Sequence, residues 1–376
     1  YAEEIKNCYI RRSLVRIGDD LINKSINPNV DVTPDQEISE TEEKLYNLAE
    51  KDQINSGPID FKSVLTSATN QINEAFNRKG KLSGIDTGFS GLNRQLGGLN
   101  KSDLIVLAGR PAMGKTALAT NIGFNAAKSS NSHQNDAILI FSLEMSAEQL
   151  AQRILAEQST IDSHKLRSGD IDEKEFSKLV ATQNDIYNLP FFIDDTPAIS
   201  VGQIASRARR LKRTSGLGLI VIDYIQLIQG SKASEAQGRV QEVSSITRGL
   251  KSIAKELNVP ILALSQLSRA VEQREDKRPI LADLRESGSI EQDADVVMFV
   301  YREEYYLDKS EPTQRDNENQ ESFNERFIKW QDRRNSAEGK AEIIISKQRH
   351  GPTGIIQVQF EAKFTRFMDL VQDNRL

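Results

Sequence analysis

The chain carries, at positions 109–116, the stretch Gly109-Arg110-Pro111-Ala112-Met113-Gly114-Lys115-Thr116. It fits the pattern G-x-x-x-x-G-K-[S/T], whose glycines let successive backbone N–H groups turn toward a phosphate. Residues 103–108 read as a buried strand entering this loop, and residues 117–127 read as a helix leaving it. The positive end of that helix would face the same anion. A chance match of the pattern is the alternative, and the strand–loop–helix setting favours a nucleotide site instead.

Composition limits the classes of protein to which the chain can belong. Its 376 residues are 38% hydrophobic and 27% charged, which predicts a globular protein with a sizeable core. No apolar run approaches the length of a membrane span. One cysteine, Cys8, and three scattered histidines argue against a disulfide framework and against a zinc site. The net charge of −5 argues against a basic coat but leaves room for a local basic channel.

The first 80 residues predict helices joined by linkers. Residues 2–26 have apolar side chains at helical spacing, and a shorter helix is expected from 35 to about 51. Residues 55–58 read as a linker. The next segment has one apolar stripe, formed by Phe61, Val64, Leu65, Ala68, Ile72, Ala75 and Phe76. This pattern predicts one amphipathic helix, and taken alone it favours packing on its own domain over docking on a neighbouring subunit.

From about residue 81, strands and helices alternate. Strands are predicted at 104–108, 137–142, 191–193, 219–222, 261–265 and 295–300. Several are continuously apolar, which is typical of parallel strands covered on both faces. Segments 342–346 and 355–360 flank a Gly-Pro-Thr-Gly turn and predict an antiparallel hairpin. The predicted fold class is therefore α/β, with a mostly parallel sheet flanked by helices. The polar stretch 307–339 is expected to be a mobile insertion with a short helix near 323–330.

Three polar residues end predicted strands. Asp223 follows the apolar strand 219–222, where its carboxylate could hold Mg²⁺ or its water ligands. Glu144 follows 137–142 and could polarise an attacking water, or be an exposed acid at a helix start. Gln266 could sense the γ-phosphate, or simply be a polar strand end. Because parallel strands point their carboxyl ends to one edge, all three are expected at that edge.

Two further segments carry charges of interest. The polar stretch 283–295 has a flexible Arg-Glu-Ser-Gly-Ser core that could hold a phosphate backbone, although the residues alone favour an ordinary capping loop. Lys347 and Arg349 lie at the predicted hairpin tip. A cation there could act as an arginine finger in a neighbour's active site, or belong to a basic surface turn.

Taken in order, the motifs GRPAMGKT, FSLEMS, LIVIDYIQLI, LSQLSR, DLRESGSIEQDAD, YREEYY and KQRHGPTG resemble those of the replicative DNA helicases of the DnaB family. The resemblance runs along the whole chain. It implies a RecA-like motor that assembles as a homohexamer, hydrolyses ATP with Mg²⁺, and moves 5′ to 3′ on single-stranded DNA. It further implies unwinding of forked DNA in replication, with primase and a helicase loader as partners and no membrane. A cytoplasmic, nucleoid-associated location is expected.

The resemblance also implies roles for individual residues. The nucleotide-binding set is Gly109, Ala112, Met113, Gly114, Lys115, Thr116 and Ala117. Thr116 and Asp223 would hold the metal. Glu144, Lys115 and Gln266 would act in hydrolysis, the last as the γ-phosphate sensor. The residues expected to reach nucleotide on the adjacent subunit are Lys347 and Arg349. The expected DNA-binding residues are Arg285, Glu286, Gly288 and Arg239.

The same resemblance divides the chain into three parts. Residues 1–54 would be the remnant of a helical N-terminal domain, most of which is missing. Residues 55–80 would be a linker whose helix docks on a neighbouring subunit, which reverses the preference from pattern alone. Residues 81–376 would be the motor, with a longer insertion at 307–339 than is usual. The alternatives are a RecA-like strand-exchange or repair ATPase and a non-catalytic ring adaptor that binds nucleotide as a structural ligand.

Overall fold

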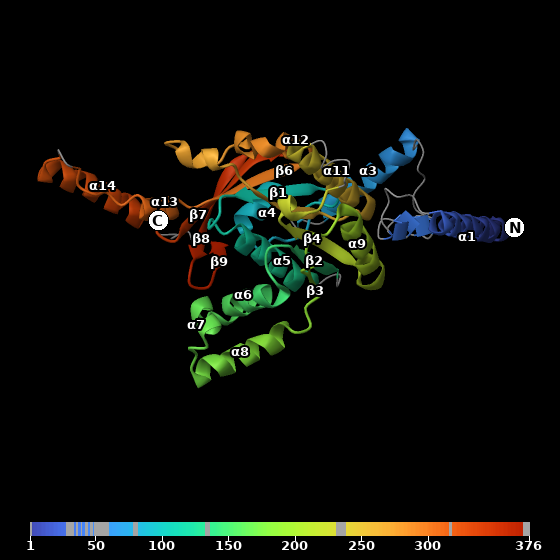
Figure 1. Cartoon of the computed structure of the whole chain (residues 1–376), viewed down its shortest axis with the longest axis horizontal. Coiled ribbons are helices and arrows are strands. Elements are labelled where there is room, and N and C mark those ends of the chain that lie inside the picture. Colours follow the sequence, from blue (N-terminus) through green and yellow to red (C-terminus); the bar gives the residue numbers. More distant parts are fainter. Residues whose placement is uncertain are drawn as a thin grey trace. The chain divides into compact units, whose positions relative to one another are not determined.

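The computed structural model describes residues 2–27, 60–77, 82–131, 136–230, 238–315 and 318–370, with single positions between 34 and 48 (Figure 1). The chain divides into two compact units. One comprises Tyr1–Lys81 with Ser200–Thr214, and the other comprises Leu82–Ile199 with Ser215–Leu376. None of the helices in the described part of the chain combines the length and the apolar character that a membrane span requires.

The first unit is helical. It contains α1 (Ala2–Ile26), α3 (Phe61–Asn77) and α9 (Val201–Ser215). Helix α3 occupies the residues of the predicted amphipathic helix, and its apolar side chains Phe61, Val64, Leu65 and Ile72 are exposed. The linker predicted at 55–58 lies outside the described residues, as does most of the helix predicted from 35 to 51.

The second unit is built on one sheet. Its strands are β1 (Leu104–Gly109), β2 (Ala137–Ser142), β3 (Phe191–Asp194), β4 (Leu217–Asp223), β5 (Ile261–Gln266), β6 (Val296–Tyr301), β7 (Lys340–Gln348), β8 (Gly354–Glu361) and β9 (Arg366–Asp369). They lie in the order β3-β2-β4-β5-β1-β6-β7-β8-β9. Strands β1 to β6 pair in parallel, and β7, β8 and β9 extend the sheet antiparallel. The predicted fold class and hairpin are confirmed, and β9 is an addition to them.

Both faces of β1, β2, β4, β5 and β6 are covered, which explains their continuous apolar sequences, whereas β3 at the end of the sheet is partly exposed. In β1, Ile105 and Leu107 join the core cluster that also contains Leu118 and Ile122 of α5 (Lys115–Asn131). Alternate residues of a strand point to opposite faces. Leu104, Val106 and Ala108 therefore face the other way, and α11 (Arg239–Leu257) packs on β1 and β5. Figure 1 shows the sheet between these two helices.

Shorter elements surround the sheet. They are α4 (Ser90–Leu96), α6 (Ala147–Ser159), α7 (Ser163–Ser168), α8 (Glu173–Ile186), η1 (Ile225–Leu227), η2 (Arg269–Gln273), η3 (Leu281–Ser287) and α12 (Gly288–Asp293). Helix α6 packs on both α7 and α8. Capping boxes begin α6 at Ser146 and α8 at Asp172, because in each a side chain accepts from the N3 backbone while the N3 side chain accepts in return.

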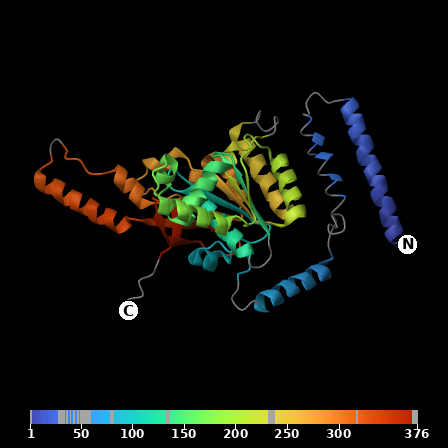
Figure 2. The same ribbon diagram turned by 90° about the horizontal axis from the view of Figure 1, so that it is seen from below.

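The polar insertion forms a helical pair that projects from the sheet in both views (Figures 1 and 2). The pair consists of α13 (Glu303–Lys309), most of which precedes residue 307, and α14 (Gln320–Ala337) within the insertion, so the helix there is longer than the short one expected near 323–330. Aromatic contacts run along α14 through Phe323, Phe327 and Trp330. The Trp330 indole donates to the Leu307 carbonyl at 3.0 Å. Spacing of i, i+4 and i+7 places these rings on one side of the helix, which stabilises it against α13.

Candidate active site

The residues predicted to bind and hydrolyse nucleotide lie together at the C-terminal ends of the parallel strands, which form one edge of the sheet. Gly109, the last residue of β1, is the register partner of Gln266 at the end of β5. Ser142, at the end of β2, is the partner of Asp223 at the end of β4. Glu144 follows two residues after Ser142. Parallel pairing alone therefore places the phosphate loop, Glu144, Asp223 and Gln266 at a common edge, as expected.

The phosphate loop has the backbone that its glycines predict. Gly114 has φ of 93°, a left-handed conformation that side-chain-bearing residues rarely adopt. A Cβ at this position would lie 2.9 Å from the ring of Phe367 on β9. The side chain of Arg110 is buried and donates to the Leu267 carbonyl at 3.0 Å and to Glu272 at 2.9 Å. The loop is thus packed against β9 at Gly114 and fastened at Arg110 to the segment that follows β5.

Lys115 lies between an aromatic ring and two carboxylates. Its ammonium nitrogen is 4.8 Å from the centre of the Tyr224 ring, which provides a cation–π contact. Burial lowers the pKa of Lys115, while the negative charges of Asp223 and Glu144 act to raise it. A cation held in this way is available to an incoming phosphate.

Asp223 is buried, and neither of its carboxylate oxygens has a hydrogen-bond partner. Burial raises its pKa, while nearby Thr116 and Lys115 act to lower it. The Thr116 hydroxyl lies close enough to Asp223 to lower that pKa. Unpaired buried carboxylates are costly unless a ligand satisfies them. The pair Thr116 and Asp223 therefore has the hard oxygen donors and the free lone pairs that a Mg²⁺ site needs.

Arg153 is part of this site, although its sequence context does not single it out. It lies on α6, and the negative charges of Asp223 and Glu144 act to raise the pKa that its burial lowers. Glu144 itself is exposed, and the backbone N–H of Leu143 beside it donates to the Asp223 carbonyl at 2.8 Å. Nothing in the local sequence distinguishes Arg153 from the other cations of the chain, because only the packing of α6 brings it to the strand ends.

The strands beyond β6 also support the loop, a role that the sequence pattern does not indicate. Arg302, which follows β6, donates to the Ala112 carbonyl at 3.3 Å and stacks on the Phe360 ring at 4.0 Å. Phe360 in turn packs on Phe367. The antiparallel end of the sheet thus supports the phosphate loop from beneath.

A buried acid anchors this support. The Phe367 backbone N–H donates to the Asn121 side chain at 2.8 Å, and Asn121 donates to Glu157 at 2.5 Å. Burial raises the pKa of Glu157 to about 7, against the opposing charges of Arg366 and Lys128. The chain Glu157–Asn121–Phe367 therefore joins α6, α5 and β9 behind the loop.

Gln266 and Arg239 are connected through Gln226, a residue of the LIVIDYIQLI motif for which the sequence predicts no role. The Gln226 side-chain amide donates to the Ser265 hydroxyl at 3.0 Å and to the Gln266 carbonyl at 3.4 Å. Its backbone carbonyl accepts from Arg239, whose guanidinium also pairs with Glu242 at 2.6 Å. Arg239, at the start of α11, is half exposed.

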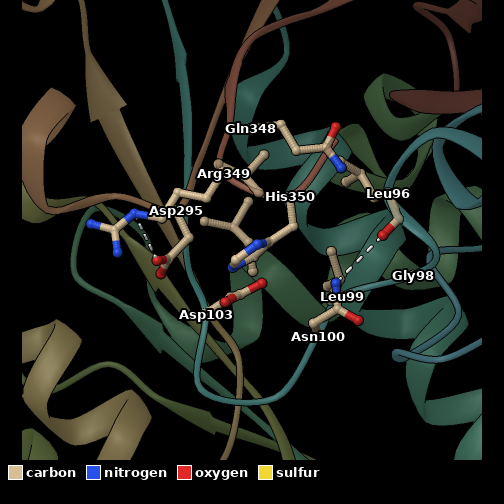
Figure 3. Close-up of a pocket in the computed structure, with 11 residues that line it drawn as sticks. Leu96, Gly98, Leu99, Asn100, Asp103, Asp295, Gln348, Arg349 and His350 are labelled. Atoms are coloured by element: carbon tan, nitrogen blue, oxygen red, sulfur yellow. Dashed lines mark hydrogen bonds and ion pairs between the residues drawn. The ribbon is translucent and has the colours of Figure 1, made fainter. Parts of the chain in front are cut away.

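Lys347 and Arg349 lie at the opposite edge of the sheet from the phosphate loop of their own chain. The Arg349 guanidinium is 3.4 Å from Asp295, and Figure 3 shows this contact. Asp295 accepts from the Leu104 backbone N–H, at the first residue of β1. A strand of this length spans about 17–20 Å. Neither cation can therefore reach the nucleotide site of its own chain without a large rearrangement.

The remaining predicted DNA-binding residues, Arg285, Glu286 and Gly288, span the end of η3 and the start of α12. The side chains of 285–289 lie outside the described residues. Their backbone leads directly through α12 to Asp295, so this segment is adjacent to the edge that carries Lys347 and Arg349.

A phosphate loop at a helix start, with acidic strand ends beside it on a mostly parallel sheet, defines a P-loop nucleoside triphosphatase of the RecA-like class. Comparisons with known proteins narrow this class. Residues 84–369 match the DnaB-like helicase C terminal domain. The chain belongs to the DnaB-like helicase family.

Individual relatives support this family membership. The chain is 45% identical over 376 residues to the replicative DNA helicase DnaB of Rickettsia bellii, covering 98% of this chain and 74% of the relative. It is 42% identical to the replicative DNA helicase DnaC of Bacillus subtilis, with the same coverage. A solved DnaB-like replicative helicase, described with its interactions with primase, has a TM-score of 0.74 and 30% identity over 98% of this chain and 78% of that one.

Proposed function

We propose that this chain is the ATP-driven motor of a replicative DNA helicase, which forms a homohexameric ring, translocates 5′ to 3′ on single-stranded DNA and unwinds the duplex at a fork. The observation that carries the motor assignment is the buried, unpartnered Asp223 carboxylate beside Lys115 and Thr116 at the phosphate loop. Membership of the DnaB-like helicase family supports the replicative role.

In this proposal the loop from Gly109 to Ala117 binds the phosphates of ATP through its backbone N–H groups and Lys115. Ala112, Met113 and Gly114 supply the turn that brings those groups together. Thr116 and Asp223 hold Mg²⁺, which neutralises charge on the phosphates when bound. Glu144, exposed at the same edge, orients and deprotonates the water that attacks the γ-phosphate. Gln266 contacts the γ-phosphate from the neighbouring strand end.

The opposite placement of Arg349 supports a site shared between subunits. Its guanidinium lies at the edge away from its own phosphate loop and is half exposed. We assign it, with Lys347, to the nucleotide held by the adjacent subunit of the ring. Both cations have partners in their own chain, since Lys347 donates to the carbonyls of Glu291, Gln292 and Ala294, and Arg349 makes longer contacts with Asp295 at 3.4 Å and the Gln292 carbonyl at 3.5 Å. The exposed apolar stripe of α3 would dock on a neighbouring subunit and strengthen the ring.

Arg285, Glu286, Gly288 and Arg239 are proposed to face the DNA in the ring channel. Contacts made mainly to phosphates make movement independent of sequence and sensitive to salt. Primase is a proposed partner because the solved relative is described with it, and a helicase loader is proposed on the family resemblance. A cytoplasmic, nucleoid-associated location follows from this role. A RecA-like strand-exchange ATPase would share the phosphate loop and the sheet, but the family match and the relatives favour the replicative helicase.

The test compares ATP-driven unwinding of two forked duplexes, one with a 5′ and one with a 3′ single-stranded tail on the loading strand. We expect unwinding only with the 5′ tail. Glu144→Gln should abolish unwinding while retaining ATP binding, and Glu148→Gln, an exposed acid on α6, should leave it unchanged. Strand pairing without unwinding would favour the strand-exchange alternative. Normal hydrolysis by Glu144→Gln would refute the catalytic assignment.

A further inference from the structure

Between the nucleotide edge and the start of α11 lies a continuous chain of polar contacts centred on Gln226. This residue belongs to η1, the short turn that directly follows Asp223 and Tyr224. It is not part of the phosphate loop and does not end a strand. It contacts two different elements, since its side chain forms a hydrogen bond with β5 and its backbone carbonyl accepts a hydrogen bond from α11.

On the β5 side, the contacts hold the backbone on both sides of Gln266. The Gln226 amide nitrogen donates to the buried Ser265 hydroxyl at 3.0 Å and to the Gln266 carbonyl at 3.4 Å. The Gln226 amide oxygen accepts from the Gln266 backbone N–H at 3.4 Å. A primary amide can make these contacts at once, because its nitrogen donates while its oxygen accepts. Movement of the Gln266 backbone would therefore change the hydrogen bonds of the Gln226 side chain directly.

On the α11 side, the carbonyl of Gln226 is held by the guanidinium of Arg239. The same guanidinium pairs with Glu242, which is buried and accepts from the Gly230 backbone N–H at 3.3 Å. Gly230 is needed here, since a Cβ would lie 2.5 Å from the Glu242 side chain. The first turn of α11 and the end of the η1 segment are thus fastened together by two charged side chains.

We propose that Gln226 is a positioning residue that couples the state of the nucleotide, read at Gln266, to Arg239 at the start of α11. This inference rests on the proposed function, in which Gln266 contacts the γ-phosphate and Arg239 faces DNA. Gln226 touches neither ligand. A shift of the β5 end on hydrolysis alters its amide contacts, and its carbonyl transmits that shift to the guanidinium of Arg239.

The test measures coupling rather than activity. Affinity for a single-stranded oligonucleotide is determined with a non-hydrolysable ATP analogue and again with ADP, and the ratio of the two dissociation constants is compared between proteins. Allosteric coupling is reciprocal and commonly changes affinity by about 5-fold or more. Gln226→Met keeps the length of the side chain but removes its donor and acceptor. We expect its ratio to fall toward one, while nucleotide affinity stays within the range of the wild type.

Gln229→Met is the matched control, because Gln229 is an exposed amide on the same segment, and it should keep the wild-type ratio. Ser265→Ala removes a single contact from the opposite side of the relay and should lower the ratio partway, even if Gln226→Met folds poorly. A full wild-type ratio in both Gln226→Met and Ser265→Ala would overturn the relay alone. Absence of any nucleotide-dependent DNA affinity in the wild type would overturn the proposed function together with the relay.

Discussion

The ammonium nitrogen of Lys347 lies 2.8 Å from the carbonyl oxygen of Ala294, just beyond the C-terminal end of α12. It also donates to the carbonyl oxygens of Glu291 and Gln292. A cation at a helix C-terminus satisfies carbonyls that have no partner inside the helix and interacts favourably with the helix dipole. The end of β7 is therefore fastened to the helix that follows the proposed DNA-binding segment.

Replacing Lys347 by alanine should destabilise the protein. The change leaves partly buried carbonyls without a donor, and we expect the free energy of unfolding to fall by about 1–3 kcal/mol. Chemical denaturation measures this. Lys340→Ala, at the exposed start of the same strand, is the control and should have little effect. Equal stability of both variants would show that the carbonyls are satisfied by water when Lys347 is absent.

Mixing two inactive variants should restore hydrolysis if Arg349 acts between subunits. Arg349→Ala should reduce the ATPase rate by about 10³–10⁵, and Lys115→Ala should remove nucleotide binding. A ring that contains both variants has some interfaces where an intact phosphate loop meets an intact Arg349. ATPase activity of the mixture is the measurement. If no activity returns although mixed rings form, Arg349 does not complete a neighbour's site.

Arg153→Ala should slow hydrolysis more than it weakens nucleotide binding. Its guanidinium lies in the field of Asp223 and Glu144, where charge develops during phosphoryl transfer. Removing one such stabilising group typically reduces kcat by about 10²–10³. Steady-state kinetics separates kcat from KM, and Arg167→Ala on α7 provides an exposed arginine control. A change in KM with an unchanged kcat would assign Arg153 to binding alone.

The buried Glu157 should make stability depend on pH. Its pKa is raised to about 7 by burial, from an ordinary value of 4.5. Between these values the folded protein retains a proton that the unfolded chain has released, so stability falls as the pH rises through this window. Above about pH 7 the contribution is constant. The raised pKa corresponds to at most about 3 kcal/mol.

Glu157→Gln is the corresponding variant, because the amide stays neutral and can still accept from Asn121. Relative to the wild type, it should gain stability from pH 5 to pH 8, as measured by denaturant unfolding at both values. Glu148→Gln, on the exposed face of the same helix, should show no such difference. The same stability difference at both pH values would mean that Glu157 does not titrate in this range.

The sequence predicts those elements well whose burial produces a clear pattern of apolar residues. Continuous apolar runs identify β1, β2, β4, β5 and β6, because both of their faces are buried, whereas β3 lies at the end of the sheet and is partly exposed. The helix α14 is longer than its sequence suggests, since its polar composition hides the contacts that Trp330 and its neighbours make with α13. The strand β9 has only four residues and no distinguishing pattern.

For the candidate site, the sequence by itself determined the phosphate loop, the strand-end residues Glu144, Asp223 and Gln266, and the edge at which they meet. It could do so because loop chemistry and parallel pairing depend on local spacing. Only the tertiary structure decided that Arg153, Gln226 and Phe367 belong with them, and that Arg349 lies at the far edge of the sheet. Those relationships arise when helices and antiparallel strands pack onto the sheet, and packing brings together residues whose separation in the sequence carries no signal.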